Sequence, residues 1–179
     1  MTDSMQQFRR QRREVRLYQW LLVLAGVMTL IWVALDTIWQ LRISAERTHV
    51  QWMVGVLKST LGTEMSRRVV RGGVAELAAM NRANPIEWLG TRPPNYGGEI
   101  ESVNESELAL RSWYFERSTG QLIYRIGETE AFWFPLGERT TIRFMVVARY
   151  HPHHMGEAAY LRGIELQTLD AYLLETPDG

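Results

Sequence analysis

The chain has 179 residues, enough for one globular domain with an appended segment and too few for two full domains joined by a long linker. It contains no cysteine, which excludes a disulfide framework, cysteine zinc sites and thiol catalysis. The formal net charge is zero, but the charge is divided unevenly. Residues 1–16 hold five arginines against Asp3 and Glu14, a net charge of +3, so the rest of the chain carries −3.

An uncharged, largely apolar run occupies residues 17–35. As a helix, these nineteen residues would measure about 28 Å, close to the thickness of the hydrocarbon core of a bilayer. Aromatic side chains, which favour the headgroup layer, lie towards both ends: Tyr18, Trp20, Trp32 and Trp39. Because the arginine cluster precedes the run, the positive-inside rule predicts a cytoplasmic N-terminus and an exported body.

A cleavable signal peptide and a buried core helix are the alternative interpretations of this run. A signal peptide has an apolar stretch of about 7–15 residues followed by a cleavage site of small residues. Here the stretch is longer and continues into residues 36–40 without such a site. A core helix seldom begins beside five arginines. We therefore expect a cytoplasmic basic tip over residues 1–16 and an uncleaved transmembrane helix over residues 17–37.

Beyond Asp36 the pattern becomes amphipathic. Apolar residues recur at steps of four and three, which places one apolar stripe along a helix. The stripe consists of Val50, Val54, Leu57, Leu61 and Met65. We expect the membrane helix to continue to about Arg71, to break at Gly72-Gly73 and to be followed by a short helix over residues 74–80. Residues 38–80 are thus predicted to form an amphipathic helical segment.

The remainder, residues 81–179, is predicted to be a sheet domain. Residues 84–107 contain proline and glycine at several positions and are expected to form a long, packed connection without regular structure. Strand patterns follow at 112–117, 121–126, 140–151 and 165–175, and residues 118–120 suit a hairpin between the first two. The predicted fold class is therefore α+β: a transmembrane helix continuing into a long amphipathic helix, packed on an antiparallel sheet of about four strands.

The sequence predicts no catalytic residues and no cofactor. It lacks the nucleophile-elbow, phosphate-loop, dinucleotide-binding and metalloprotease motifs, so we do not expect an enzyme. Outside the basic tip, the arginines are scattered among acids, which argues against nucleic-acid binding.

The one dense cluster of potential metal ligands is His151, His153 and His154, whose imidazoles suit zinc, copper or nickel. A proline separates these histidines and no second ligand group lies at helical spacing, so we predict a polar loop and no metal site. An envelope sensor or ligand-binding module that uses this cluster for metal or pH is the alternative function.

Two surfaces are expected to contact other proteins, namely the helix between Trp39 and Met65 and the loop between Trp88 and Tyr96. Tryptophan and tyrosine are favoured as anchors of protein interfaces. The expected interface residues are Trp39, Val50, Val54, Leu57, Leu61, Trp88 and Tyr96. For the aromatic residues, Trp88 and Trp113 above all, burial in the domain core is the alternative.

Four segments of the middle of the chain carry a resemblance to a known family. They are Asn-Pro-Ile-Glu-Trp-Leu at 84–89, Pro-Asn-Tyr-Gly-Gly-Glu at 94–99, Ser-Trp-Tyr-Phe-Glu at 112–116 and Gly-Gln-Leu-Ile-Tyr-Arg-Ile at 120–126. These segments resemble accessory biogenesis proteins of mannose-sensitive haemagglutinin (MSHA) type pili, which are pilin-like in layout but uncleaved. The layout of the whole chain is similar to type IV pilins and type II secretion pseudopilins, without the glycine and the glutamate of the prepilin cleavage signal.

The resemblance implies a non-enzymatic, single-pass protein of the bacterial inner membrane that serves type IV pilus biogenesis or type II secretion assembly. Its C-terminal domain would lie in the periplasm and would act through protein–protein contacts. The implied partners are the lipid bilayer and other pilus or secretion proteins. Pairing of the long helix with a second copy of the chain is left open.

Overall fold

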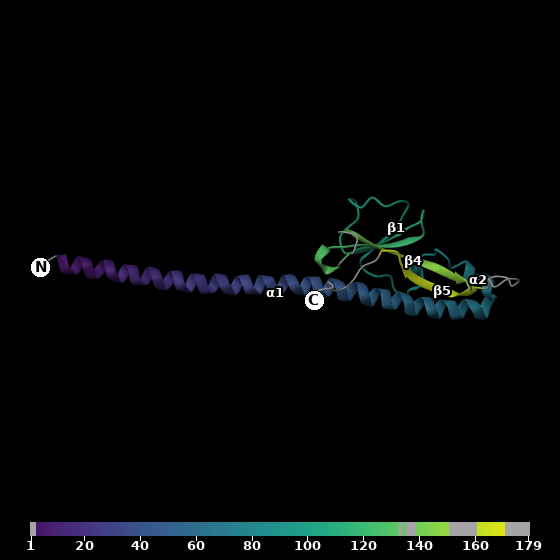
Figure 1. The fold of residues 1–179 in the computed structure, drawn as a ribbon, viewed down its shortest axis with the longest axis horizontal. Helices are drawn as coiled ribbons and strands as arrows, with labels where there is room; N and C mark the ends of the chain where they lie inside the picture. Colours follow the sequence, from purple (N-terminus) through teal and green to yellow (C-terminus); the bar gives the residue numbers. More distant parts are fainter. Residues whose placement is uncertain (1–2, 133, 135–138, 151–160, 171–179) are drawn as a thin grey trace. The chain divides into compact units, whose positions relative to one another are not determined.

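The computed structural model describes residues 3–132, 134, 139–150 and 161–170, with only the backbone described for residues 3–17, 74, 75 and 130. The fold is α+β, and Figure 1 shows its elements along the chain. Two compact units are present, residues 1–42 and residues 43–179. In chain order the elements are α1 (Asp3–Gly72), α2 (Val74–Ala78), η1 (Pro85–Trp88), β1 (Tyr96–Ile100), β2 (Ser112–Glu116), β3 (Gln121–Arg125), η2 (Thr129–Ala131), β4 (Thr141–Tyr150) and β5 (Leu161–Thr168).

In the first unit, residues 3–42 all belong to α1. Its side chains from Tyr18 to Arg42 are exposed, and this part of the helix is long and apolar enough to cross a membrane. Two threonine hydroxyls are satisfied within the helix, because Thr29 donates to the carbonyl of Ala25 and Thr37 to that of Val33, both at 2.9 Å. Internal hydrogen bonding of this kind suits a helix in lipid, where water cannot supply partners.

In the second unit, α1 continues from Ile43 to Gly72 and packs on a five-stranded sheet of order β1-β2-β3-β4-β5. The strands from β2 to β5 pair antiparallel, whereas β1 runs parallel to β2. The expectation of an antiparallel sheet of about four strands is therefore corrected to a mixed sheet of five.

The additional strand, β1, lies inside the segment predicted to lack regular structure. Its central residues Gly97 and Gly98 carry no side chains that could show an alternating pattern. The strand forms because β2 supplies the partner. Trp113 N donates to Asn95 O, just before β1, and Arg117 N donates to Ile100 O at its end, both at 2.9 Å.

The predicted hairpin and the long strand are confirmed. β2 and β3 pair around a turn in which Gly120 has a φ of +68° and its N–H donates to Glu116 O at 2.9 Å. β4 covers Thr141–Tyr150, within one residue of the prediction at each end. β5 begins four residues before the strand predicted at 165–175 and ends at Thr168, and residues 171–175 lie outside the described part of the chain.

The apolar stripe of α1 supplies the helical half of the core. Val50, Leu57 and Leu61 are buried, and Val54 and Met65 pack at the edge of the same cluster. The sheet contributes the other half, in which the ring of Trp113 lies 4.8 Å from that of Tyr124 and 5.7 Å from that of Phe144. Burial of each large apolar side chain stabilises the domain by about 1.5–3 kcal/mol. Met53 is also buried, although the stripe predicted from the sequence did not include it.

The predicted break after α1 and the short helix that follows it are confirmed, and a helical turn that was not predicted comes next. Gly73, with a φ of +70°, follows the last helical residue, and its N–H donates to Val69 O at 3.2 Å. The short helix α2 then occupies Val74–Ala78. Asn84 caps η1, since its side-chain oxygen accepts from Ile86 N at 3.1 Å, and Pro85 occupies the first position of that turn.

Candidate functional site

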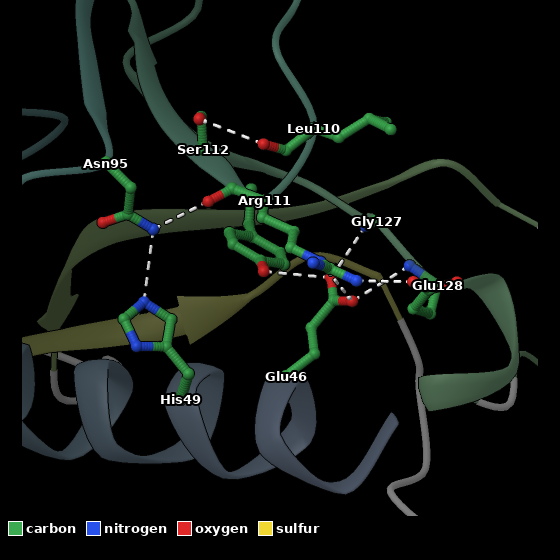
Figure 2. Close-up of polar contacts among 9 residues, drawn as sticks. Glu46, His49, Asn95, Leu110, Arg111, Ser112, Gly127 and Glu128 are labelled. Carbon is green, nitrogen blue, oxygen red and sulfur yellow. Dashed lines mark hydrogen bonds and ion pairs between the residues drawn. The ribbon is translucent and has the colours of Figure 1, made fainter. Parts of the chain in front are cut away.

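A buried carboxylate joins α1 to the sheet. Glu46 is 5% exposed and accepts hydrogen bonds from Tyr124 Oη at 3.0 Å, Gly127 N at 2.7 Å and Glu128 N at 2.9 Å. The guanidinium of Arg111 lies 3.5 Å from the same carboxylate (Figure 2). Burial, together with the neighbouring charge of Glu46, raises the pKa of Tyr124, so the phenol stays protonated and acts as a donor.

The same turn of α1 makes further contacts with the segment that follows β3. Arg47 Nε donates to Ala131 O at 3.1 Å, and Arg111 also pairs with the carboxylate of Glu128. Glu46 and Arg47 therefore hold the backbone of residues 127–131 against the helix. These contacts position the helix on the sheet. Three of the groups that bind Glu46 and Arg47, namely Gly127 N, Glu128 N and Ala131 O, are backbone groups that any sequence would supply at those places.

His49 lies one turn further along α1. Its Nε2 is 3.2 Å from Asn95 Nδ2, which also donates to Arg111 O at 2.7 Å (Figure 2). Because an amide nitrogen is only a donor, His49 accepts through Nε2 in this arrangement. The ring of His49 is 6.2 Å from that of Trp52. His49 thus connects the buried contacts to the outer surface of the helix.

The structure buries three of the residues expected to contact other proteins. Val50, Leu57 and Leu61 are at most 3% exposed, because the sheet of the same domain covers the stripe of α1 on which they lie. Val54 is half-buried at the edge of that stripe. The stripe therefore serves the domain's own core, and a protein partner would have to use another face of the helix.

The loop between Trp88 and Tyr96 is packed onto the domain, as expected. Trp88 is half-buried against the core, and the guanidinium carbon of Arg68 lies 5.7 Å from the centre of its ring. Tyr96 is also half-buried and its hydroxyl accepts from Asn84 Nδ2 at 2.9 Å. Burial raises the pKa of Tyr96 despite this hydrogen bond. Both aromatic residues contribute to packing, with only part of each ring accessible.

Two tryptophans of α1 are exposed. Trp39, in the first unit, is 47% exposed, and Trp52, in the second unit, is 61% exposed. Trp52 lies within the helical surface predicted between Trp39 and Met65 but was not singled out from the sequence. The sequence could have indicated this residue, because Trp52 is a large aromatic residue that lies off the apolar stripe, two positions after Val50 and two before Val54. An exposed tryptophan on a polar helix face is a candidate anchor for a partner.

The histidine cluster His151, His153 and His154 lies outside the described residues. Within the described part of the chain, no group of three or more histidine, aspartate or glutamate side chains is arranged to hold a metal ion. Comparisons of the chain with protein-family models, with curated protein sequences and with solved structures found no match.

Proposed function

We propose that this protein is a single-pass membrane component of an envelope assembly machinery and acts through protein contacts, without catalysis. One observation carries the proposal. The same helix, α1, contains an exposed apolar segment of membrane-spanning length and, further along, the stripe that forms half of a domain core. A single helix with both features anchors a folded domain to a membrane.

The proposed orientation and machinery are based on the sequence. The arginines of the N-terminal tip favour a cytoplasmic N-terminus in the bacterial inner membrane, with the domain of residues 43–179 in the periplasm. The resemblance of residues 84–126 to MSHA-type accessory proteins is our reason for proposing type IV pilus biogenesis or type II secretion assembly as the machinery. The helix-on-sheet layer of the domain supports that resemblance.

Trp52 is the centre of the contact surface that we propose. It projects from the part of α1 that packs on the sheet, and 61% of its surface is exposed. The contacts of Glu46 with Gly127 and of His49 with Asn95 hold the turns of α1 that precede it. A large aromatic side chain on a rigid helix loses little conformational entropy on binding, which suits an interface anchor.

The direct test is capture of partners by the full-length, tagged chain. The chain is expressed in the bacterium that carries it, membranes are washed with alkaline carbonate and extracted in mild detergent, and captured proteins are identified by mass spectrometry. We expect retention in the washed membranes and capture of pilus or secretion proteins. Release by carbonate, or the absence of such proteins together with unchanged piliation and secretion in a deletion strain, contradicts the proposal.

Matched variants locate the contact surface. Trp52→Ala should reduce partner capture at least fivefold, because it removes the exposed anchor. Leu110→Ala is the control, since Leu110 is 59% exposed in the same domain and belongs to a loop and not to α1. Both variants should unfold at the denaturant concentration of the wild type. Equal capture by the two variants would exclude Trp52 as the anchor.

A further inference from the structure

The polar side chains of the membrane-spanning part of α1 lie on one face of the helix. At about 100° of rotation per residue, those of residues 18–41, tryptophan apart, fall within an arc of about 100°. Leu22 and Val33 lie in the same arc, and the rest of the circumference is aliphatic or tryptophan. We call this surface the polar face. Its polar and small residues are Tyr18, Gln19, Gly26, Thr29, Asp36, Thr37 and Gln40.

Depth in the membrane does not explain this segregation. Near the N-terminal end of the span, Gln19 is on the polar face and Trp20 is not. Near the other end, Gln40 is on the polar face and Trp39 is not. Residues at one depth meet the same layer of lipid on every side of an isolated helix. A protein neighbour on one side does explain the segregation, because polar residues of transmembrane segments face other helices.

The polar groups of this face are only partly satisfied within the chain. Gln40 Nε2 donates to Asp36 Oδ2 at 3.0 Å. Among the described residues, however, no arginine, lysine or histidine nitrogen lies within 4.0 Å of the Asp36 carboxylate. All described side chains from Tyr18 to Arg42 are exposed, so the outer side of this face is free to bind. Carboxylate and carboxamide groups of this kind hold transmembrane helices together by hydrogen bonds.

The centre of the polar face suits the close approach of a second helix. Its residues recur at steps of four, three and seven, the spacing of a left-handed helix pair. A Cβ atom at Gly26 would meet nothing within 4 Å, so no contact inside the described chain requires a glycine there. Glycine inside a helix costs about 1 kcal/mol relative to alanine, but between two helices it lets the backbones approach closely. The central residues are Leu22, Gly26, Thr29, Val33 and Gln40.

The polar face is complementary to a copy of itself. In a symmetric parallel pair, one flank of each helix lies opposite the other flank of its copy. Asp36 is about 50° to one side of the central residues, and Thr37 is about 50° to the other side. Each Asp36 would therefore meet a Thr37 hydroxyl of the copy, and the two carboxylates would stay on opposite sides of the pair. Tyr18 and Gln19 are related in the same way, and the central Gln40 carboxamides can donate to and accept from each other.

We propose that the polar face binds the polar face of a second copy of this chain, so that two parallel α1 helices pair within the membrane. The inference rests on the proposed membrane span, and it deepens the proposed function by naming one partner and the surface that meets it. A second copy has the same topology and is therefore parallel. The alternative occupant is a helix of another protein, with a lysine or arginine at the depth of Asp36.

Photo-cross-linking of the full-length chain tests which face meets which protein. During expression in a bacterial host that lacks this machinery, p-benzoylphenylalanine replaces Leu22 or Val33 on the polar face. In matched controls it replaces Leu24 or Ile31, at similar depths on the opposite face. Illumination should give an adduct of twice the chain mass from the two polar-face positions, and at most about a tenth as much from the controls.

Two results of the cross-linking would overturn the proposal. One is an equal yield of the double-mass adduct from both faces, which would mean collision without a defined surface. The other is the absence of that adduct from all four positions. Adducts of the polar face with other proteins only, in the bacterium that carries the chain, would assign the face to a foreign helix and likewise overturn pairing with a second copy.

Variants then measure the contacts of the pair. Förster energy transfer between labelled full-length chains in lipid vesicles gives the dissociation constant of the pair. Gly26→Ile should weaken pairing at least tenfold, because it blocks the close approach of the backbones. Ala34→Ile is the matched control, since Ala34 lies outside the polar face, and it should change pairing less than twofold. Equal effects of the two substitutions overturn the proposed surface.

A double-mutant cycle tests the contact between Asp36 and the Thr37 of the copy. Asp36→Leu and Thr37→Val should each weaken pairing at least fivefold, because symmetry removes the contact twice. The double variant should pair at most twofold more weakly than the weaker single variant, because both substitutions remove the same contact. Losses that multiply would show that the two side chains do not meet, and would overturn the proposed arrangement.

Failure of the pairing can be distinguished from failure of the proposed function. A chain that resists carbonate extraction and captures pilus or secretion proteins, but forms no pair in either measurement, contradicts the pairing alone. A chain that carbonate releases from the membrane contradicts the membrane span on which both proposals rest.

Discussion

Two buried carboxylates, Glu46 and Asp170, have their partners far along the chain. Glu46 lies on α1 and is bound by groups near β3, 78 to 82 residues away. Asp170 follows β5 and is bound by Arg143 and Arg139, 27 and 31 residues before it. Each carboxylate is satisfied by several donors at once, which is the condition under which a buried charge is tolerated. Neither belongs to a local pattern, so periodicity alone could not single them out.

Replacing Glu46 by glutamine tests the junction between α1 and the sheet. The amide nitrogen of Glu46→Gln would meet the N–H group of Gly127 or Glu128, and one of these donors would lose its acceptor. We expect a loss of about 1–3 kcal/mol in the free energy of unfolding. Tyr124→Phe, which removes only one donor, should cost about 1 kcal/mol. Urea denaturation of both variants measures the difference, and a smaller effect of Glu46→Gln would contradict this role.

Asp170 makes the stability of the domain depend on acid pH. Burial acts to raise the pKa of Asp170, but the hydrogen bonds and charge of Arg143, with the charge of Arg139, outweigh it and hold that pKa below the ordinary value of 3.8. The unfolded chain therefore binds a proton at Asp170 before the folded chain does. Stability from this group is present above the unfolded pKa and is lost as the pH falls through the lower, folded pKa.

The measurement is the free energy of unfolding in urea from pH 7 to pH 3. Asp170→Asn should remove part of the decline that the wild type shows at the acid end of this range. Glu165→Gln is the control: Arg149 also lowers the pKa of Glu165, but both side chains are about half exposed, so the change in slope should be smaller. A wild-type decline that Asp170→Asn leaves intact would show that other groups cause it.

At the scale of elements, two glycines with positive φ end the helix and turn the hairpin. Gly73 has a φ of +70° and Gly120 a φ of +68°. A Cβ atom at Gly73 would meet nothing within 4 Å, whereas one at Gly120 would lie 2.6 Å from Arg82 Cβ and 2.8 Å from Arg82 O. The two positions therefore separate the cost of the backbone conformation from the cost of a steric clash.

Alanine substitutions at these glycines should differ in a defined direction. Gly73→Ala should cost about 1–2 kcal/mol, the penalty of a left-handed conformation for a residue with a side chain. Gly120→Ala should cost more, because the backbone oxygen of Arg82 cannot move aside as a flexible side chain would. Thermal and urea unfolding of the two variants give the comparison. Equal losses would mean that the loop containing Arg82 shifts freely.

Some helices and strands could be predicted from the local sequence pattern alone, and others could not. α1 follows from a long run without proline, and β4 follows from alternation of apolar and polar residues. β1 did not follow, because its Gly97-Gly98 pair has no side-chain pattern and its hydrogen bonds come from β2. The predicted bounds of β5 differ from the observed ones for a similar reason. The extent of this strand is set by its pairing with β4, from Tyr150 opposite Leu161 to Phe144 opposite Thr168.

At the scale of the whole molecule, the chain divides into a unit over residues 1–42 and a unit over residues 43–179. The described core residues all belong to the second unit, and the first unit consists of helix whose described side chains are exposed. Cooperative unfolding should therefore be a property of the second unit. The apolar surface of the first unit must be covered by something other than its own helix, which lipid or detergent can supply.

A pair of apolar substitutions tests this division in the full-length chain in detergent micelles. Leu61→Ala should lower the free energy of unfolding by about 2–5 kcal/mol, because Leu61 is 3% exposed in the core. Trp32→Ala should leave it within about 0.5 kcal/mol, because Trp32 is 70% exposed. The readout is the denaturation midpoint followed by near-ultraviolet circular dichroism. A comparable loss in Trp32→Ala would mean that the two units unfold together.

The sequence by itself determined the features that depend on neighbours along the chain. These are the uncharged run of residues 17–35, the stripe of α1, the break at Gly73, the β2–β3 hairpin and most of β4. Only the tertiary structure decided what the stripe contacts: the sheet covers Val50, Leu57 and Leu61, while Trp52 stays exposed. It also brought Glu116 of β2, Arg139, which precedes β4, and Arg143 of β4 around one cavity. Periodicity reports which residues share a face, whereas pairing between distant strands determines what that face meets.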